Sequence, residues 1–188
     1  MDALFKKVGA KNGSVNGVFY SVGDIDNVSF NLANTISPEQ LNYHLPMKVK
    51  GLAVLKKVVN KNTLDFAAVM SSFSSVLGGL GMVGYAISNQ YVDSFVNQES
   101  STCESTKWMS FNFSYWDMEG DGADFQERSF LKMEKIGDDI SNTSITAHEG
   151  RKVFGHLLSI NNDQPQVIVS PIHFPTLKEK FQNIAMTI

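Results

Sequence analysis

The chain has 188 residues, 43% of them hydrophobic, and a formal net charge of −3. This length and apolar content suffice for one well-buried core, and a single cysteine excludes an intramolecular disulfide framework. The charge is uneven, because residues 1–61 carry eight lysines and four acids, whereas residues 62–145 carry four basic and twelve acidic residues.

The first 45 residues are rich in Gly, Asn and Ser and have few periodic apolar positions. We therefore expect residues 1–45 to be a partly ordered N-terminal arm. Within it, 4–8 could form a short amphipathic anchor, and 15–19 or 28–32 could add edge strands. Ser37, followed by Pro38 and by Gln40 three residues on, is typical of a helix start, which Pro46 should soon end.

From Met47 the pattern becomes regular. Residues 47–59 are rich in β-branched and apolar side chains and predict a strand. Residues 63–77 predict a helix capped by Thr63, because their apolar side chains recur at helical spacing. The stripe consists of Phe66, Val69, Met70, Phe73 and Leu77, and Gly78-Gly79 should end it.

The second half predicts mostly strands. Residues 108–117 give the cleanest apolar–polar alternation, and Thr146 with Glu149 has the spacing of a helical capping box. The further elements expected are strands at 82–87, 91–96, 130–135 and 166–170, an acidic turn at 117–124, a helix from Thr146 with the stripe Gly150, Val153, Phe154, Leu157 and Leu158, and a short helix from Pro175. This order predicts the α+β class, with an antiparallel β-sheet covered by two or three helices. The core domain would span 46–175, and 176–188 would be a C-terminal helix or tail.

No motif in the chain predicts catalysis, a cofactor, a metal or a small-molecule substrate. Gly79, Gly81 and Gly84 match dinucleotide-binding spacing, but with a helix expected before them and a strand after, the context is inverted. The acids of 117–124 lack the final glutamate of a calcium loop. Cys103 lies beside Glu99 and Glu104, whose charge should disfavour a thiolate, so we expect an ordinary free thiol.

Lysines are the clearest binding signal. Five of them, with no acid, lie between residues 47 and 61. On the expected strand they form a ridge suited to an anionic membrane surface or an RNA backbone, helped by two lysines in the arm. The candidate binding residues are Lys48, Lys50, Lys56, Lys57, Lys61, Lys6 and Lys7.

The element order resembles that of rhabdovirus matrix proteins, including plant-infecting members. In that family a strand (MKVKGLAVLKKVV here) leads into a helix (NTLDFAAVMSSFSSVLGG) and later to an aromatic strand that ends in an acidic turn (KWMSFNFSYWDMEGDGAD). A helix and a return strand (ITAHEGRKVFGHLLSINNDQPQVIVSPI) close the domain. The likeness covers roughly residues 47–172, and the arm carries no Pro-rich budding motif.

The resemblance implies a non-enzymatic viral structural protein. It would self-associate, condense the viral nucleoprotein–RNA complex and link it to an anionic membrane as a peripheral protein, in the virion and in the host cytoplasm or nucleus. The arm would mediate self-association through Leu4, Phe5, Val8, Ile36, Leu41, Tyr43 and Pro46. The alternatives are a nucleic-acid-binding accessory protein, such as a movement protein or silencing suppressor, and a small enzyme whose site is scattered through the fold.

Overall fold

A computed structural model describes residues 1–23, 33–62, 64–78, 81–117, 144–159 and 163–187. Its centre is a four-stranded sheet in the order β1-β2-β3-β6, and all three strand pairs are parallel. A two-stranded parallel ribbon, β4-β5, lies apart from it. The strands are β1 (Gly17–Tyr20), β2 (Phe66–Ser72), β3 (Lys107–Phe113), β4 (Trp116–Asp117), β5 (Ile145–Thr146) and β6 (Gln166–Val169).

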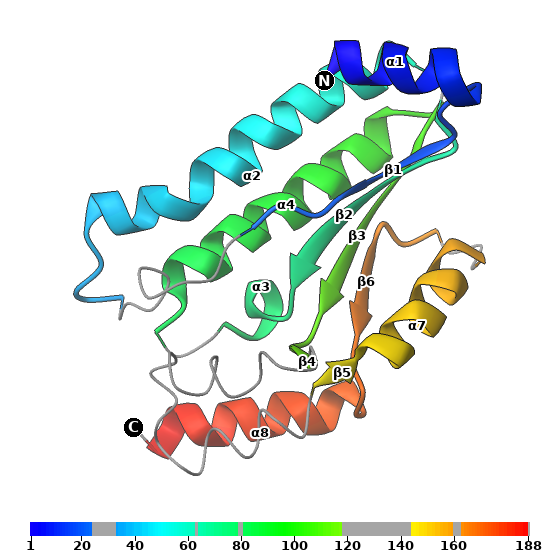
Figure 1. Cartoon of the computed structure of the whole chain (residues 1–188). Helices are drawn as coiled ribbons and strands as arrows, with labels where there is room; N and C mark the ends of the chain where they lie inside the picture. The colour runs from blue at the N-terminus through cyan, green and yellow to red at the C-terminus, as the bar shows by residue number, and fades with distance from the viewer. Residues whose placement is uncertain (24–32, 63, 79–80, 118–143, 160–162, 188) are drawn as a thin grey trace.

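Helices lie on both faces of this sheet. Helices α2 and α4 lie side by side along one face, and α7 covers the other (Figure 1). The helices are α1 (Asp2–Asn12), α2 (Pro38–Val59), α3 (Ser74–Leu77), α4 (Val83–Thr102), α7 (Ala147–Ser159) and α8 (Phe174–Thr187). The predicted α+β class with an antiparallel sheet is therefore wrong: the sheet is parallel, and helices connect its strands in an α/β arrangement.

The predicted strand at 47–59 is the second half of α2. The helix begins at Pro38, is capped by Ser37 in the predicted capping box with Gln40, and continues through Pro46 to Val59. Its buried side chains fall at helical spacing, at His44, Lys48, Leu52, Leu55, Val58 and Val59. The β-branched composition suggested a strand, but the burial period is that of a helix.

The predicted helix at 63–77 contains β2 and the short helix α3. Strand β2 lies between β1 and β3, so neither of its edges is free, and helices cover both faces of the sheet (Figure 1). Ala67, Ala68 and Val69 are consecutive and completely buried. A central strand of a parallel sheet typically has a continuous run of apolar residues. In β2 some of these residues also lie at helical spacing by chance, which led to the wrong prediction.

The two strands predicted at 82–87 and 91–96 are a single helix, α4. Its buried face runs through Gly84, Ser88, Val92 and Val96 at steps of four residues. Because several residues on that face are polar, the hydrophobic pattern did not reveal the helix. Gly78 and Gly81 thus precede a helix instead of a strand, Gly84 lies in the first turn of that helix, and α3 separates all three from β2.

Several predicted elements are confirmed. An edge strand lies at 17–20, the aromatic strand is β3, and the return strand is β6. Helix α7 begins with the expected capping box, in which Thr146 Oγ1 accepts from the Glu149 backbone and the Glu149 carboxylate accepts from the Thr146 backbone. The last helix is α8.

The expected strands at 28–32 and 130–135 and the acidic turn after Asp117 lie outside the described residues. The division into an arm at 1–45, a core at 46–175 and a tail at 176–188 stays a prediction. Residues 17–20 nevertheless pair with β2 in the main sheet.

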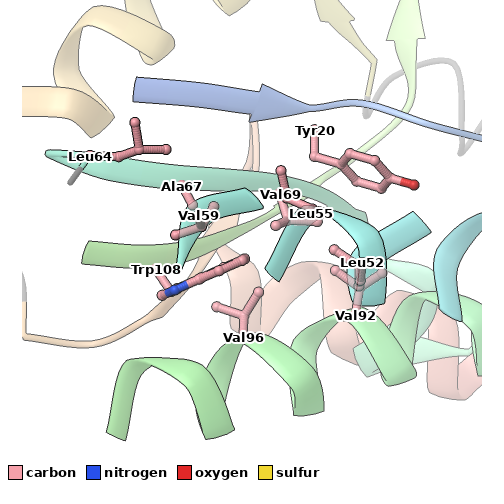
Figure 2. Packing of buried hydrophobic residues seen from close by; sticks show 10 residues of the cluster. All are labelled: Tyr20, Leu52, Leu55, Val59, Leu64, Ala67, Val69, Val92, Val96 and Trp108. Atoms are coloured by element: carbon pink, nitrogen blue, oxygen red, sulfur yellow. The ribbon is translucent and has the colours of Figure 1, made fainter. Parts of the chain in front are cut away.

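One core cluster joins the two long helices to the sheet. Figure 2 shows side chains from α2, α4 and β3 meeting beneath β2, with the Trp108 indole against them. Its members are Tyr20, Leu52, Leu55, Val59, Leu64, Ala67, Val69, Val92, Val96 and Trp108. This packing fixes α2 and α4 relative to the carboxyl end of β2, where the polar site lies.

Candidate active site

Polar side chains of α2 and α4 meet the carboxyl end of β2. Ser72 is the last residue of β2, Lys48 projects from α2, and Tyr85 and Asn89 lie one turn apart on α4. The carboxyl edge of a parallel sheet is where ligands bind in open α/β folds. The position in the fold therefore makes these four residues a candidate active site.

Lys48 is a buried cation at the centre of this group, with only 6% of its surface exposed. Its ammonium group donates to Asn89 Oδ1 at 3.0 Å and to the Met70 carbonyl oxygen at 3.4 Å. Burial lowers the pKa of Lys48 from 10.5 to about 8, and the negative charge of Asp93 opposes that shift. The amine is thus protonated at neutral pH but gives up its proton more readily than an exposed lysine.

Tyr85 lies in the first turn of α4 and supplies a phenol. Burial raises its pKa, while side-chain hydrogen bonds with Ser72 and Asn89 oppose the rise. The phenol is therefore protonated at neutral pH and can act as an acid. The His44 ring contacts the Tyr85 ring edge-on, with centroids 5.7 Å apart, which restrains the tyrosine side chain.

Asn89 connects Lys48 and Tyr85, the two residues of the site whose side chains can ionise. Its side-chain amide accepts from Lys48 and donates at 2.9 Å to the Tyr85 backbone carbonyl, which fixes the amide orientation. Its own backbone carbonyl accepts from Ser71 Oγ at 3.4 Å. A protonated phenol, a neighbouring hydroxyl and a buried ammonium group can together protonate a carbonyl oxygen and stabilise the phenolate that remains.

The predicted lysine ridge is not a continuous surface in this structure. Lys48 and Lys50 are two residues apart on a helix, so one is buried and the other exposed. Lys56 pairs with Glu99 at 2.6 Å, and Lys61 pairs with Asp2 at 2.7 Å. The remaining three are exposed: Lys57 on α2, and Lys6 and Lys7 on α1. The binding role assigned to these lysines stays a prediction.

The predicted self-association residues lie in two places. On α1, Leu4 is exposed, whereas Phe5 packs against the main core and Val8 is half-buried. Around the start of α2, Pro46 is exposed, and the others, Ile36, Leu41 and Tyr43, are partly buried. Their role in self-association also stays a prediction.

Cys103 differs from the ordinary thiol expected from the sequence. It follows the end of α4 and lines a pocket of about 440 Å³ together with Lys56, Glu99 and Ser105. Hydrogen bonding with the Ser105 side chain is the main cause that lowers the pKa of this thiol, and backbone N–H groups of Ser105 and Thr106 add to it. The neighbouring acids do not raise the pKa as the sequence suggested.

Sequence reasoning missed Ser72, Tyr85 and Asn89, and placed Lys48 on the wrong kind of surface. A usable signal was present: Tyr85, Asn89 and Asp93 recur every four residues, which is helical spacing on one face. A polar stripe at that spacing, beside small residues such as Gly84 and Ser88, indicates a helix that packs closely and carries chemistry.

A scan against protein families matches the KR domain model over residues 1–118. Among curated proteins, the chain is 33% identical over 107 residues to the polyketide synthase PksN of Bacillus subtilis, covering 54% of the chain and 2% of that protein. It is 28% identical over 159 residues to 6-methylsalicylic acid synthase of Aspergillus terreus, covering 83% and 8%. The chain thus spans only a small part of these relatives.

Solved structures show the same fold. An N-terminal ketoreductase from the macrolactin assembly line superposes with a TM-score of 0.71 at 23% identity, covering 96% of this chain and 33% of that one. A short-chain dehydrogenase from Streptomyces avermitilis gives 0.71 at 11% identity, covering 99% and 70%. The parallel sheet with its flanking helices is therefore Rossmann-like.

These matches correct the predicted viral identity. The family match covers 1–118, which includes much of the region that suggested a rhabdovirus matrix protein, so that resemblance is wrong. The predictions of a non-enzymatic structural protein, of nucleoprotein and membrane partners, and of a virion location are wrong with it, because the relatives are bacterial and fungal polyketide synthases. Among the described helices, none combines the length with the apolar content that a membrane-spanning segment requires.

Proposed function

This chain belongs to the KR domain family, and from that premise we propose that it reduces a ketone to an alcohol as part of a polyketide synthase. The observation that carries the proposal is the group Lys48, Ser72, Tyr85 and Asn89 at the carboxyl end of β2, in which Lys48 and Asn89 are buried and Ser72 and Tyr85 are half-buried. The substrate we propose is a β-ketoacyl thioester, because polyketide assembly passes through such ketones and the curated relatives are polyketide synthases.

Tyr85 is the proton donor in this proposal. Burial holds its phenol in the protonated form. Ser72, hydrogen-bonded to the phenol, is placed to orient the same carbonyl oxygen. As the oxygen gains negative charge, Tyr85 transfers its proton, and the resulting phenolate is stabilised by Ser72 and by the Lys48–Asn89 pair.

Reduction also needs a hydride, which no amino-acid side chain supplies. A nicotinamide cofactor would deliver that hydride to the carbonyl carbon. The residues present fit such a group: Lys48 has two acceptors among the described residues, which leaves one of its three ammonium hydrogens for a cofactor hydroxyl. Gly23 lies beside this amine, and a Cβ there would be 3.8 Å from Lys48 Nζ, an ordinary van der Waals contact, so the glycine leaves the space next to the amine open.

The test is NADPH consumption with a β-ketoacyl thioester, with the alcohol product identified by mass spectrometry. Tyr85→Phe should lower kcat by about 100-fold or more, the usual contribution of a positioned acid. Tyr91→Phe removes a hydroxyl from the same helix outside the site and should retain activity. Absence of NADPH-dependent alcohol formation by the unmodified protein, or full activity in Tyr85→Phe, would refute the proposal.

A further inference from the structure

We infer that Asp93 is a positioning residue that acts through Lys48: its buried carboxylate keeps the active-site ammonium group charged, and donors from three other elements hold it in place. The kinetic part of this inference rests on the proposed reductase function. The electrostatic part concerns two side chains of this protein and can be measured without substrate.

Asp93 lies one helical turn beyond Asn89 on the buried face of α4 and is 5% exposed. Three side chains donate to its Oδ2 atom: Ser75 Oγ at 2.5 Å, Asn112 Nδ2 at 2.7 Å and Gln166 Nε2 at 3.1 Å. They come from α3, β3 and β6, so elements far apart in sequence converge on one carboxylate oxygen. These three hydrogen bonds fix the position and orientation of the carboxylate.

The other carboxylate oxygen, Oδ1, is buried and has no hydrogen-bond partner among the described residues. A purely structural hub would gain from satisfying both oxygens, because an unpaired buried polar atom costs about 1–3 kcal/mol. An isosteric amide at position 93 could still accept from the three donors. What the carboxylate adds is therefore its charge.

Lys48 is the cation next to this carboxylate in the fold: its ammonium group donates to Asn89 Oδ1, and Asn89 lies one turn before Asp93 on the same buried face of α4. The titratable groups packed around Lys48 are His44, one turn earlier on α2, and Tyr85 and Asp93 on α4, while β2 contributes the uncharged Met70 carbonyl. The attraction of Asp93 raises the pKa of Lys48 against the larger lowering effect of burial. Among these groups, Asp93 supplies the carboxylate.

Losing this charge would change the chemistry of the site. Burial alone would drive Lys48 toward the neutral amine near physiological pH. A neutral Lys48 could no longer stabilise a phenolate at Tyr85 by its charge. Asp93 thus extends to higher pH the range over which the site can work, although it touches neither substrate nor cofactor in the proposed reaction.

The experiment is an NMR titration of the Lys48 13Cε signal, assigned by its absence in Lys48→Arg. In Asp93→Asn the midpoint should fall by about one pH unit or more, the low end of the effect of a nearby opposite charge. Glu104→Gln is the matched control: it removes one exposed acid in the loop after α4 and should leave the midpoint within about 0.3 unit, since exposed charges are screened.

Enzyme kinetics test the kinetic part of the inference separately from the electrostatic part. The alkaline limb of kcat should move to lower pH in Asp93→Asn by the same amount as the Lys48 midpoint, which a merely structural defect would not produce. An unchanged midpoint overturns the inference even if the protein is an active reductase. A shifted midpoint in a protein without reductase activity refutes the proposed function and the catalytic role of Asp93, and leaves the coupling between the two charges established.

Folding of the variants is checked by circular dichroism. Should Asp93→Asn fail to fold, Asp93→Ser carries the same test, because its small hydroxyl can still accept from a neighbouring donor without charge. A Lys48 midpoint that matches the unmodified protein in Asp93→Ser would overturn the inference equally.

Discussion

Replacing Lys48 with methionine should remove a pH-dependent penalty that the native protein carries at neutral pH. Burial lowers the pKa of Lys48 from 10.5 to about 8, a difference of about 2.5 units. At 1.36 kcal/mol per unit, the charged amine therefore destabilises the native state by about 3 kcal/mol. The residue is 6% exposed, so solvent screening does little to reduce this figure.

The sign follows from the direction of the shift. The native pKa lies below the unfolded one, so the unfolded chain binds the proton more tightly. The penalty is complete below about pH 8, shrinks as the pH rises, and is gone above about pH 10.5. Relative to Lys48→Met, the unmodified protein should gain about 3 kcal/mol in free energy of unfolding across this interval.

At neutral pH the variant should gain less than the full penalty. The thioether side chain in Lys48→Met cannot donate to Asn89 Oδ1 or to the Met70 carbonyl, and each acceptor left without a partner costs about 1–3 kcal/mol. The change in free energy of unfolding at pH 7 is therefore the small difference between the removed desolvation penalty and the cost of the two lost hydrogen bonds. The pH dependence is the discriminating quantity, because the lost hydrogen bonds contribute much less to it.

The assay is urea denaturation at intervals from pH 7 to pH 10.5, with the free energy of unfolding obtained by linear extrapolation. Lys57→Met changes an exposed lysine on the same helix and should follow the unmodified protein at every pH. Parallel pH profiles for the unmodified protein and Lys48→Met would show that burial does not perturb this amine, and the reasoning would be refuted.

Three further predictions concern packing, capping and the thiol. A Cβ at Gly51 would overlap the Tyr20 hydroxyl, so Gly51→Ala should lower the free energy of unfolding by about 1–3 kcal/mol. Adding Tyr20→Phe to this variant should recover part of the lost stability. An unchanged urea midpoint in Gly51→Ala would contradict the predicted overlap. Thr146→Ala removes the α7 capping box and should lower the free energy of unfolding by about 1 kcal/mol in the same urea assay. The lowered pKa of Cys103 predicts faster alkylation by iodoacetamide at pH 7 than in Ser105→Ala, and equal rates would exclude the hydrogen bond as its cause.

Helix caps could be predicted from the sequence better than the direction of the strands. Both capping boxes, at Ser37 and Thr146, depend on side chains three residues apart, so the sequence alone specifies them. The direction of the strands was wrong because pairing is set by residues far apart. Ser110, for instance, pairs with both Val69 and Gln166, in parallel.

The errors in assigning the two long helices, α2 and α4, share a physical cause. Periodicity methods assume that buried positions are apolar, and this assumption fails in α2 and α4. Lys48, Asn89 and Asp93 are buried polar residues on the faces that pack together. Because these residues were treated as surface residues, the apparent hydrophobic period changed, and α4 was predicted as two strands.

The same three residues explain why the site could not be located from the sequence. A buried lysine is unfavourable unless hydrogen bonds and an opposite charge compensate it. Its partners lie 41 residues away at Asn89 and one further turn along α4 at Asp93. Once the fold places them together, the exception to hydrophobic burial becomes the best indicator of function: a charge kept inside the protein against its desolvation penalty has a role that stability alone does not explain.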